Sequence, residues 1–283
     1  MAKYECVTID TFDKFRDEIK FMQPWLREEF MDVGGGTISI EDIDRIKEYP
    51  QAEVVTISGL KQDTFEYFIE TYGHQFKAIR FWKNKLVSDW SLLGELPDLE
   101  FIHWFHNQRI SSFWDMSKNI ALKAIGIEDF TRLKSLEGIE SAPNLEWLSI
   151  GDAVWATSVV NSYSPLKFTK IKHLDFYGAN IIDKDFAFLK EMKCLREFNF
   201  LQNLLTTEQV AWIVANCLDL KGQSLCPAKI LNGSPRSFDE QYVYVTGKGK
   251  RGFVLQGNQK RLRKIEDDFQ MLVEKYRGAD YPL

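Results

Sequence analysis

The sequence predicts an α/β fold: a solenoid with a curved parallel sheet on its concave face, short helices on its convex face and a distinct cap at each end. Three observations predict this fold. Apolar residues recur with a 3-2-3 spacing, the recurrences begin at positions 52, 76, 99, 122, 145, 171 and 195, and helix-like segments separate them. The steps of 23 to 26 residues are typical of units that bury an apolar row only by stacking on their neighbours.

Seven copies of the pattern follow from this spacing. The two clearest have the form LxxLxLxxNxL with aromatic substitutions: Phe76/Ile79/Phe81/Asn84/Leu86 and Leu195/Phe198/Phe200/Asn203/Leu205. The others are Leu99/Ile102/Trp104/Asn107, Leu122/Ile125/Ile127/Phe130, Leu145/Leu148/Ile150/Ala153, Ile171/Leu174/Phe176/Ala179 and the weaker Ala52/Val55/Ile57/Leu60. In each copy the 3-2-3 set points one row of side chains inward from a short strand.

On these residues the chain resembles the leucine-rich-repeat family over about residues 52–217. The stretch 136–148 looks like the short bacterial, internalin-type repeat through Leu136, Ile139, Pro143, Leu145 and Leu148. The resemblance implies that the asparagine of each copy bonds the backbone of the neighbouring turn. Phe130, Ala153 and Ala179 replace that asparagine in the middle copies, so we expect the polar ladder to be interrupted there. Accidental apolar spacing in an ordinary α/β domain is the alternative.

The two ends differ from the middle, which divides the chain into an N-terminal helical cap (residues 1–51), the repeats (52–217) and a C-terminal cap (218–283). Residues 1–50 carry 12 acids and 7 bases, whereas residues 218–283 carry 8 acids and 12 bases. A helix is expected over residues 11 to about 30, interrupted by Pro24, from the apolar residues Phe12, Phe15, Ile19, Phe21 and Trp25. A triple-glycine loop and a short helix with Ser39 as N-cap and Asp42 three residues on follow, ending near Pro50.

Helical segments are also expected between the strands and in the C-terminal cap. Residues 88–97 and 183–190 have helix-like apolar spacing over one or two turns, and Thr206 can cap a longer helix that closes the last clear copy. Residues 242–246 and 252–255 read as a β-hairpin. A helix from about residue 258 to 276 then carries its apolar side chains at Leu262, Ile265, Phe269, Leu272 and Val273.

Composition indicates a soluble globular chain with a full core, because 45% of its residues are hydrophobic and 27% are charged. The first residues carry an acid where a signal peptide would be apolar, and no segment offers 18 uninterrupted apolar residues, so we expect a cytoplasmic protein that contacts no membrane. The four cysteines show neither CxxC pairing nor histidines at metal-ligand spacing, which favours free buried thiols. No cofactor, metal or catalytic motif is expected, and a monomer is favoured.

Three motifs suggest chemistry but have simpler explanations. Gly247, Gly249, Gly252 and Val254 match the glycine-rich loop of kinases, yet only 29 residues follow, too few for a catalytic lobe. A flexible basic turn is the simpler interpretation, with anion binding as the alternative. His103 and His106 are separated by an odd number of strand positions, which sends their side chains to opposite faces and disfavours a shared metal.

A basic stretch in the C-terminal cap is a possible secondary patch. Its seven bases have no acid among them: Lys248, Lys250, Arg251, Lys260, Arg261, Arg263 and Lys264. A solvated face, a docking site for an acidic protein and a nucleic-acid site are all open interpretations. Nucleic acid is disfavoured, because the whole chain has a pI near 5.6 and contains no recognised nucleic-acid module.

The concave face is the candidate binding surface. Three columns of strand side chains are expected to point to it: Ala78, Phe101, Ala124, Trp147, His173 and Glu197; Arg80, His103, Gly126, Ser149, Asp175 and Asn199; Trp82, Phe105, Glu128, Gly151, Tyr177 and Leu201. Exposed aromatics are costly unless a partner covers them. The expected partner-binding residues are Arg80, Trp82, Phe101, His103, Phe105, Trp147, His173, Asp175 and Tyr177. The alternative is that these aromatics only pack on one another.

The sequence therefore favours a non-catalytic module that binds an unidentified partner protein on its concave face. A specific alternative is an immunity or antitoxin protein that masks a toxin or an enzyme. A third alternative is an effector that resembles the bacterial leucine-rich-repeat ubiquitin ligases, in which a catalytic cysteine domain follows the repeats. Cys226 is followed by Pro227 and Ala228, without the acidic residue that such a nucleophile would require, and about 65 residues are too few for the domain.

Overall fold

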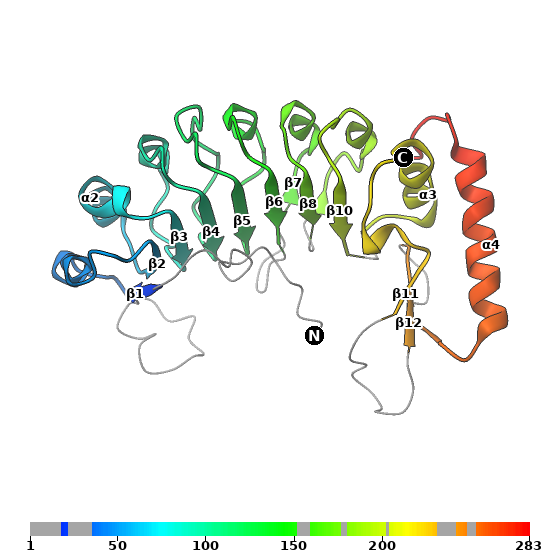
Figure 1. Cartoon of the computed structure of the whole chain (residues 1–283), viewed down its shortest axis with the longest axis horizontal. Coiled ribbons are helices and arrows are strands. Elements are labelled where there is room, and N and C mark those ends of the chain that lie inside the picture. The colour runs from blue at the N-terminus through cyan, green and yellow to red at the C-terminus, as the bar shows by residue number, and fades with distance from the viewer. Residues whose placement is uncertain are drawn as a thin grey trace.

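The chain folds as an α/β protein with a single open parallel sheet of eight strands. The computed structural model describes residues 18–21, 36–151, 159–176, 180–201, 204–230, 242–247 and 253–283. The strand order is β1-β2-β3-β4-β5-β6-β8-β10, so nearly every strand pairs with its neighbours in the sequence. Figure 1 shows these strands along the inner side of an arch and the helices and turns along its outer side.

The strands are short and regularly spaced. They are β1 Ile19–Phe21, β2 Val54–Ser58, β3 Ala78–Trp82, β4 Phe101–Phe105, β5 Ala124–Glu128, β6 Trp147–Ile150, β8 His173–Phe176 and β10 Glu197–Phe200. A separate pair, β7 (Val159–Val160) and β9 (Asn180–Ile181), forms a two-stranded parallel sheet beside β6 and β8.

Strand pairing places the aligned copies side by side. In consecutive rungs Val55 pairs with Ile79, Ile79 with Ile102 and Ile102 with Ile125, and the same rows continue to β10. The second apolar row runs in the same way from Ile57 through Phe81 to Phe200. These side chains are at most 2% exposed, so the two rows form the core between the sheet and the outer segments.

The outer segments are mostly 3₁₀ helices. They are Gly73–Gln75, Ser91–Glu95, Ile139–Ser141, Ser164–Phe168 and Ala187–Lys190, and the longer α2 (Gln62–Tyr72) lies between β2 and β3. The segments expected at residues 88–97 and 183–190 are therefore 3₁₀ turns. A tight turn fits because the chain must reverse within 23 to 26 residues while satisfying its backbone groups locally. Buried Asn119 supports the turn at Ser91–Glu95, since its Nδ2 donates to the carbonyls of Leu93 and Leu96 at 2.7 and 2.9 Å.

A left-handed residue ends four consecutive strands at the same position. Gly59, Lys83, His106 and Asp129 have φ values of 78°, 57°, 57° and 53°. They are separated by 24, 23 and 23 residues, and the equivalent positions of the later copies lie outside the described residues. Three of the four are not glycine, so each accepts a backbone conformation that L residues rarely adopt.

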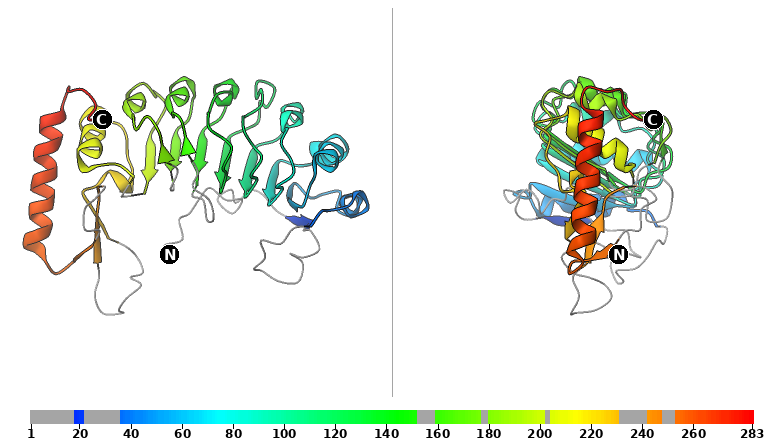
Figure 2. Two further views of the ribbon diagram at one scale, coloured as in Figure 1. Left: turned by 180° about the vertical axis from the view of Figure 1, so that it is seen from behind. Right: turned by 90° about the vertical axis from the view of Figure 1, so that its right-hand side faces the viewer.

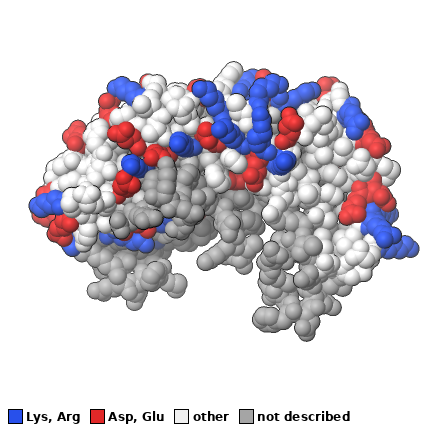
Figure 3. Space-filling view, viewed as in Figure 1, with Lys and Arg blue, Asp and Glu red and all other residues white. Residues whose placement is uncertain are grey.

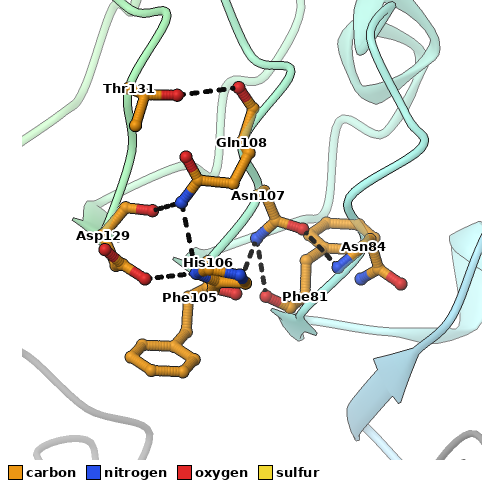
Figure 4. A network of polar contacts seen from close by, with 8 residues as sticks. All are labelled: Phe81, Asn84, Phe105, His106, Asn107, Gln108, Asp129 and Thr131. Atoms are coloured by element: carbon orange, nitrogen blue, oxygen red, sulfur yellow. Dashed lines mark hydrogen bonds and ion pairs between the residues drawn. The ribbon is translucent and has the colours of Figure 1, made fainter. Parts of the chain in front are cut away.

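The predicted asparagine ladder is present between the early copies (Figure 4). The Nδ2 of Asn84 donates to Ile57 O at 3.0 Å, and its Oδ1 accepts from Leu60 N at 2.8 Å. Asn107 repeats the arrangement one rung later: its Oδ1 accepts from Asn84 N at 2.9 Å, and its Nδ2 donates to Phe81 O at 2.9 Å. Both side chains are buried, so these bonds satisfy the interior backbone at the strand ends.

The ladder changes where Phe130 takes the asparagine position. Gln108 instead donates from Nε2 to Asp129 O at 2.5 Å, and His106 Nδ1 lies in contact with the buried carboxylate of Asp129 (Figure 4). Phe130 itself is fully buried. The interruption expected at Phe130 is therefore confirmed, and a histidine–aspartate contact links these two turns. The positions of Ala153, Ala179 and Asn203 lie outside the described residues.

The N-terminal cap was predicted wrongly in one part. Ile19–Phe21 is strand β1, not part of a helix, and it pairs in parallel with Val55, Thr56 and Ile57. Without β1, strand β2 would present an unpaired edge, so tertiary pairing overrides the helical spacing of the apolar residues. Apart from Glu18, the rest of residues 11–30 lies outside the described residues, as does the triple glycine except Gly36. The short helix α1 (Ile40–Ile43) is as predicted, with Asp42 N donating to Ser39 Oγ, and continues as the 3₁₀ helix Asp44–Glu48.

The C-terminal cap closes the other end of the sheet (Figure 2). The predicted helices are present as α3 (Thr207–Asn216), capped by Thr206, and α4 (Gln259–Tyr276), capped by Asn258. Trp212 Nε1 donates to Ala279 O at 2.8 Å and ties α3 to the chain that follows α4. The predicted hairpin is β12 (Tyr242–Val245) with β13 (Phe253–Leu255), and β11 (Ala228–Ile230) extends it to three strands.

Close backbone contacts explain two glycines of this cap. A Cβ at Gly222 would lie 2.0 Å from Phe198 O, and one at Gly247 would lie 2.2 Å from Thr207 Oγ1. Gly247 also has φ 128°. The chain therefore needs glycine to pass against β10 and against the start of α3.

Candidate functional site

Two of the three predicted columns run the length of the sheet, and the third is described from Trp82 through Phe105 to Glu128. The first column pairs in succession from β3 to β10 and consists of Ala78, Phe101, Ala124, Trp147, His173 and Glu197. The second column, from Arg80 to Asn199, pairs in the same way. Exposure differs sharply along these columns. The inner face therefore has two parts, an N-terminal part on β2 to β5 and a C-terminal part on β6, β8 and β10.

The N-terminal part is buried, which corrects the expectation of an exposed aromatic surface. Phe101 is 0% exposed, His103 4% and Phe105 8%. Phe101 packs in a second apolar cluster with Val54, Ala78 and Ala124. These aromatics are covered within the fold, so they cannot contact a partner in this conformation.

The remaining predicted residues of this part, Trp82 and Arg80, contact side chains of neighbouring strands or of the segment before β1. Trp82 stacks on Phe105 with ring centroids 4.1 Å apart. Arg80 is half-buried and lies 3.6 Å from the carboxylate of Glu18, the residue before β1, and Glu18 also accepts a 2.5 Å hydrogen bond from Thr56 Oγ1. In this part of the face the aromatic side chains pack on one another, as the alternative interpretation of the sequence predicts.

Each histidine of the His103/His106 pair contacts a carboxylate of the next copy. His103 Nε2 lies 3.1 Å from Glu128 Oε1, and His106 Nδ1 contacts Asp129 Oδ2. Within the part of the chain that the structure describes, no group of three or more His, Cys, Asp or Glu side chains could hold a metal.

The C-terminal part of the inner face keeps accessible groups. Trp147 is half-buried and stacks on His173 with ring centroids 4.9 Å apart and planes at 29°. The side chains of His173 and Glu197 are 37% and 46% exposed, and His173 Nδ1 lies 3.2 Å from Glu197 Oε2. These residues come from three adjacent strands, because the parallel register places equivalent positions next to one another.

A buried carboxylate lies at the centre of this group. Asp175 is 4% exposed, so the expectation that it faces solvent is wrong. Its Oδ2 accepts from Trp147 Nε1 at 2.8 Å, and its Oδ1 accepts from Asn199 Nδ2 at 3.0 Å. The hydrogen bond to Asp175 therefore fixes the orientation of the Trp147 ring, which is half-buried.

The electrostatics of Asp175 follow from its burial. Burial raises the pKa of Asp175 above the ordinary aspartate value, and the hydrogen bonds from Trp147 and Asn199 lower it in part. The negative charge of Glu197 also raises the pKa of Asp175. Two carboxylates beside an accessible indole ring form a site that attracts a cation, since the face of an indole binds Lys or Arg side chains.

We name this group the Trp147 cluster: Trp147, His173, Asp175, Glu197 and Asn199. The sequence selected three of its members as binding residues. Glu197 and Asn199 stand in the predicted columns but were not among the predicted binding residues. Glu18 was missed because nothing in the sequence shows that the segment before β1 reaches Arg80.

Other predicted residues lie elsewhere. Tyr177, Lys248, Lys250 and Arg251 lie outside the described residues. Four bases of the predicted secondary patch are exposed on the first two turns of α4, namely Lys260, Arg261, Arg263 and Lys264. Cys226 is exposed and precedes β11.

Comparisons with known proteins identify no relative. The chain matches no protein-family model, and no curated protein matches it. Among the helices of the described residues, none combines the length and the apolar character needed to cross a membrane.

Proposed function

We propose that the chain is a leucine-rich-repeat solenoid that acts without catalysis, binding a partner protein through the Trp147 cluster. Three regularities support the repeat assignment. The aligned copies pair rung by rung, a left-handed residue recurs at the end of four consecutive strands, and Asn84 and Asn107 bond the preceding turn in the same way.

The observation that carries the binding proposal is the contrast in exposure along one face. Phe101 and Phe105 are buried, whereas Trp147 and His173 keep accessible surface. A rigid indole that is held by a buried carboxylate loses little conformational entropy on binding, and tryptophan is enriched among the residues that dominate interface energies.

The chemistry of the Trp147 cluster favours a basic side chain from the partner. Asp175 and Glu197 provide negative charge, and the Trp147 ring provides a face for a cation. A lysine or arginine that inserts here gains both interactions in a site partly shielded from water. The proposed location is cytoplasmic, following the composition of the chain.

The test is a binding measurement with a purified partner. The partner is first isolated by affinity capture on the wild-type chain, and its Kd is then measured against Trp147→Ala and His173→Ala. We expect Trp147→Ala to weaken binding by about 30-fold or more, the effect of losing an interface hot spot of about 2 kcal/mol. Met271→Ala is the control, because Met271 is 61% exposed on α4, far from the inner face.

Equal affinity of Trp147→Ala and Met271→Ala for the partner would remove the Trp147 cluster as the binding site. Thermal unfolding of each variant separates this outcome from misfolding. A variant that unfolds at the wild-type temperature but loses the partner supports the proposal.

A further inference from the structure

A row of charged side chains runs along the edge of the sheet where the strands begin. In the eight-stranded sheet, the residue immediately before each strand from β2 to β10 is charged, in the order Glu53, Lys77, Glu100, Lys123, Glu146, Lys172 and Arg196. Backbone bonds place these residues in adjacent rungs: each N–H from Lys77 to Arg196 donates to the carbonyl of the preceding member at 2.7–2.9 Å. Neighbouring members are therefore separated by about 4.8 Å, the spacing of paired strands.

The sign alternates along the first six members. Lys77 Nζ lies 2.5 Å from Glu53 Oε1, and Lys172 Nζ lies 2.7 Å from Glu146 Oε1. The charges of Glu53 and Glu100 both raise the pKa of Lys77. Opposite charges in neighbouring rungs stabilise the pairing, so this part of the row serves the fold.

The alternation ends at β10. Arg196 follows Lys172, where an acid would continue the pattern, and its Nη1 donates to the carbonyls of Lys193 and Leu195 at 2.9 and 2.8 Å. Like charges in adjacent rungs are unfavourable. Stability of the sheet therefore does not account for Arg196.

More bases gather around this break. Lys167, Lys170, Lys190 and Lys193 lie in the turns that lead into β8 and β10, and together with Lys172 and Arg196 we name them the basic rim. Figure 3 shows Lys and Arg side chains collected over this part of the sheet, whereas acids and bases are mixed toward β2. Within the described chain, Lys170 and Lys193 reach only backbone carbonyls, at Pro143 and Lys190.

Exposed apolar side chains accompany the basic rim. Phe168 is 69% exposed with Lys167 Nζ 5.1 Å from its ring, and Leu218 is 83% exposed. Leu218 follows Cys217, whose thiol lies close enough to Lys190 and Lys193 for both charges to act on its pKa. A surface with both positive charge and exposed apolar groups suits a partner with acidic and apolar side chains.

We infer that the basic rim binds an acidic segment of a protein partner. A protein segment is favoured over a nucleic acid as the occupant, because a phosphate backbone carries no apolar side chains that could cover the exposed Phe168 and Leu218. An acidic protein segment needs only local complementarity, and its apolar side chains can cover Phe168 and Leu218. The basic rim shares no residue with the Trp147 cluster, so failure of one surface leaves the other to be judged separately.

The test measures binding of a fluorescein-labelled decaglutamate peptide to the full chain by anisotropy at low ionic strength. We expect the wild type to bind, and Arg196→Glu combined with Lys193→Glu to weaken binding at least about tenfold, which corresponds to about 1.4 kcal/mol. Lys123→Glu is the matched control for Arg196→Glu alone, since each reverses one charge of the row and Lys123 lies in the alternating part. It should leave the Kd unchanged.

Thermal unfolding gives an independent readout. Lys123→Glu places three acids in adjacent rungs and should lower the unfolding midpoint by about 1–2 °C. Arg196→Glu restores the alternation and should not lower it. The inference is overturned if the peptide does not bind, if Lys123→Glu weakens binding as much as the double variant, or if a ten-nucleotide single-stranded DNA binds more tightly than the peptide.

Discussion

The two halves of the inner sheet face have the same backbone but different surfaces. On β2 to β5 most strand side chains are buried, Asn84 and Asn107 satisfy the interior backbone, and charges alternate along the sheet edge. On β6, β8 and β10 the Trp147–His173 pair keeps accessible surface, the buried carboxylate of Asp175 accepts hydrogen bonds from Trp147 and Asn199, and Lys172 and Arg196 place two bases in adjacent rungs. The first half is organised for stability, whereas the second half retains groups that cost stability, which is the physical basis for placing function there.

The largest expected effect is the loss of folding stability when an aromatic side chain of the inner face is removed, and it should differ between the two halves. Phe101→Ala should lower the free energy of unfolding by about 3–5 kcal/mol, because its fully buried ring cannot be replaced without a cavity. Trp147→Ala should cost clearly less, since part of that ring is already in water. Urea unfolding measures both. Equal losses would show that the two halves are packed alike and would break the comparison.

An intermediate effect is expected from the asparagine ladder. Asn107→Ala should destabilise the chain by about 2–4 kcal/mol, because it removes the partner of Asn84 N and of Phe81 O inside the structure. Asn144→Ala is the control, since Asn144 makes one exposed bond to Ile120 O. We expect a change within about 0.5 kcal/mol for the control. If Asn107→Ala lowers the free energy of unfolding no more than Asn144→Ala does, water replaces the hydrogen bonds of the ladder.

The smallest effect is a pH dependence of opposite sign at two carboxylates, Asp44 in the 3₁₀ helix before β2 and Asp175 on β8. Hydrogen bonds from Tyr67 and Tyr72 hold the pKa of Asp44 below its ordinary value, so its stabilisation is present above that value and is lost as the pH falls. Burial raises the pKa of Asp175, so its contribution is greatest below the ordinary carboxyl range and is lost as the pH rises.

Unfolding of Asp44→Asn and Asp175→Asn between acidic and neutral pH tests this contrast. Relative to the wild type, Asp44→Asn should become less stable as the pH rises, and Asp175→Asn should become more stable. Parallel trends in the two variants would show that the two carboxylates have similar environments.

The sequence predicted most of the regular structure because its cause is local. The 3-2-3 spacing gave the register of β2 to β10, Thr206 and Ser39 marked helix starts through side-chain caps, and the hairpin and α4 followed from their own periodicity. The segment around Ile19 was read as helical because its apolar residues fit that period. Only pairing with β2, 35 or more residues away, makes it a strand.

The sequence alone determined which residues align in neighbouring rungs, because a strand alternates its side chains and the copies recur at nearly constant steps. It therefore placed Trp147, His173 and Asp175 on one face correctly. Only the tertiary structure decided which of those side chains stay accessible, since burial depends on what packs against the face from elsewhere in the chain. The same difference explains why the bases at Lys193 and Arg196 gained significance only once the strands were stacked.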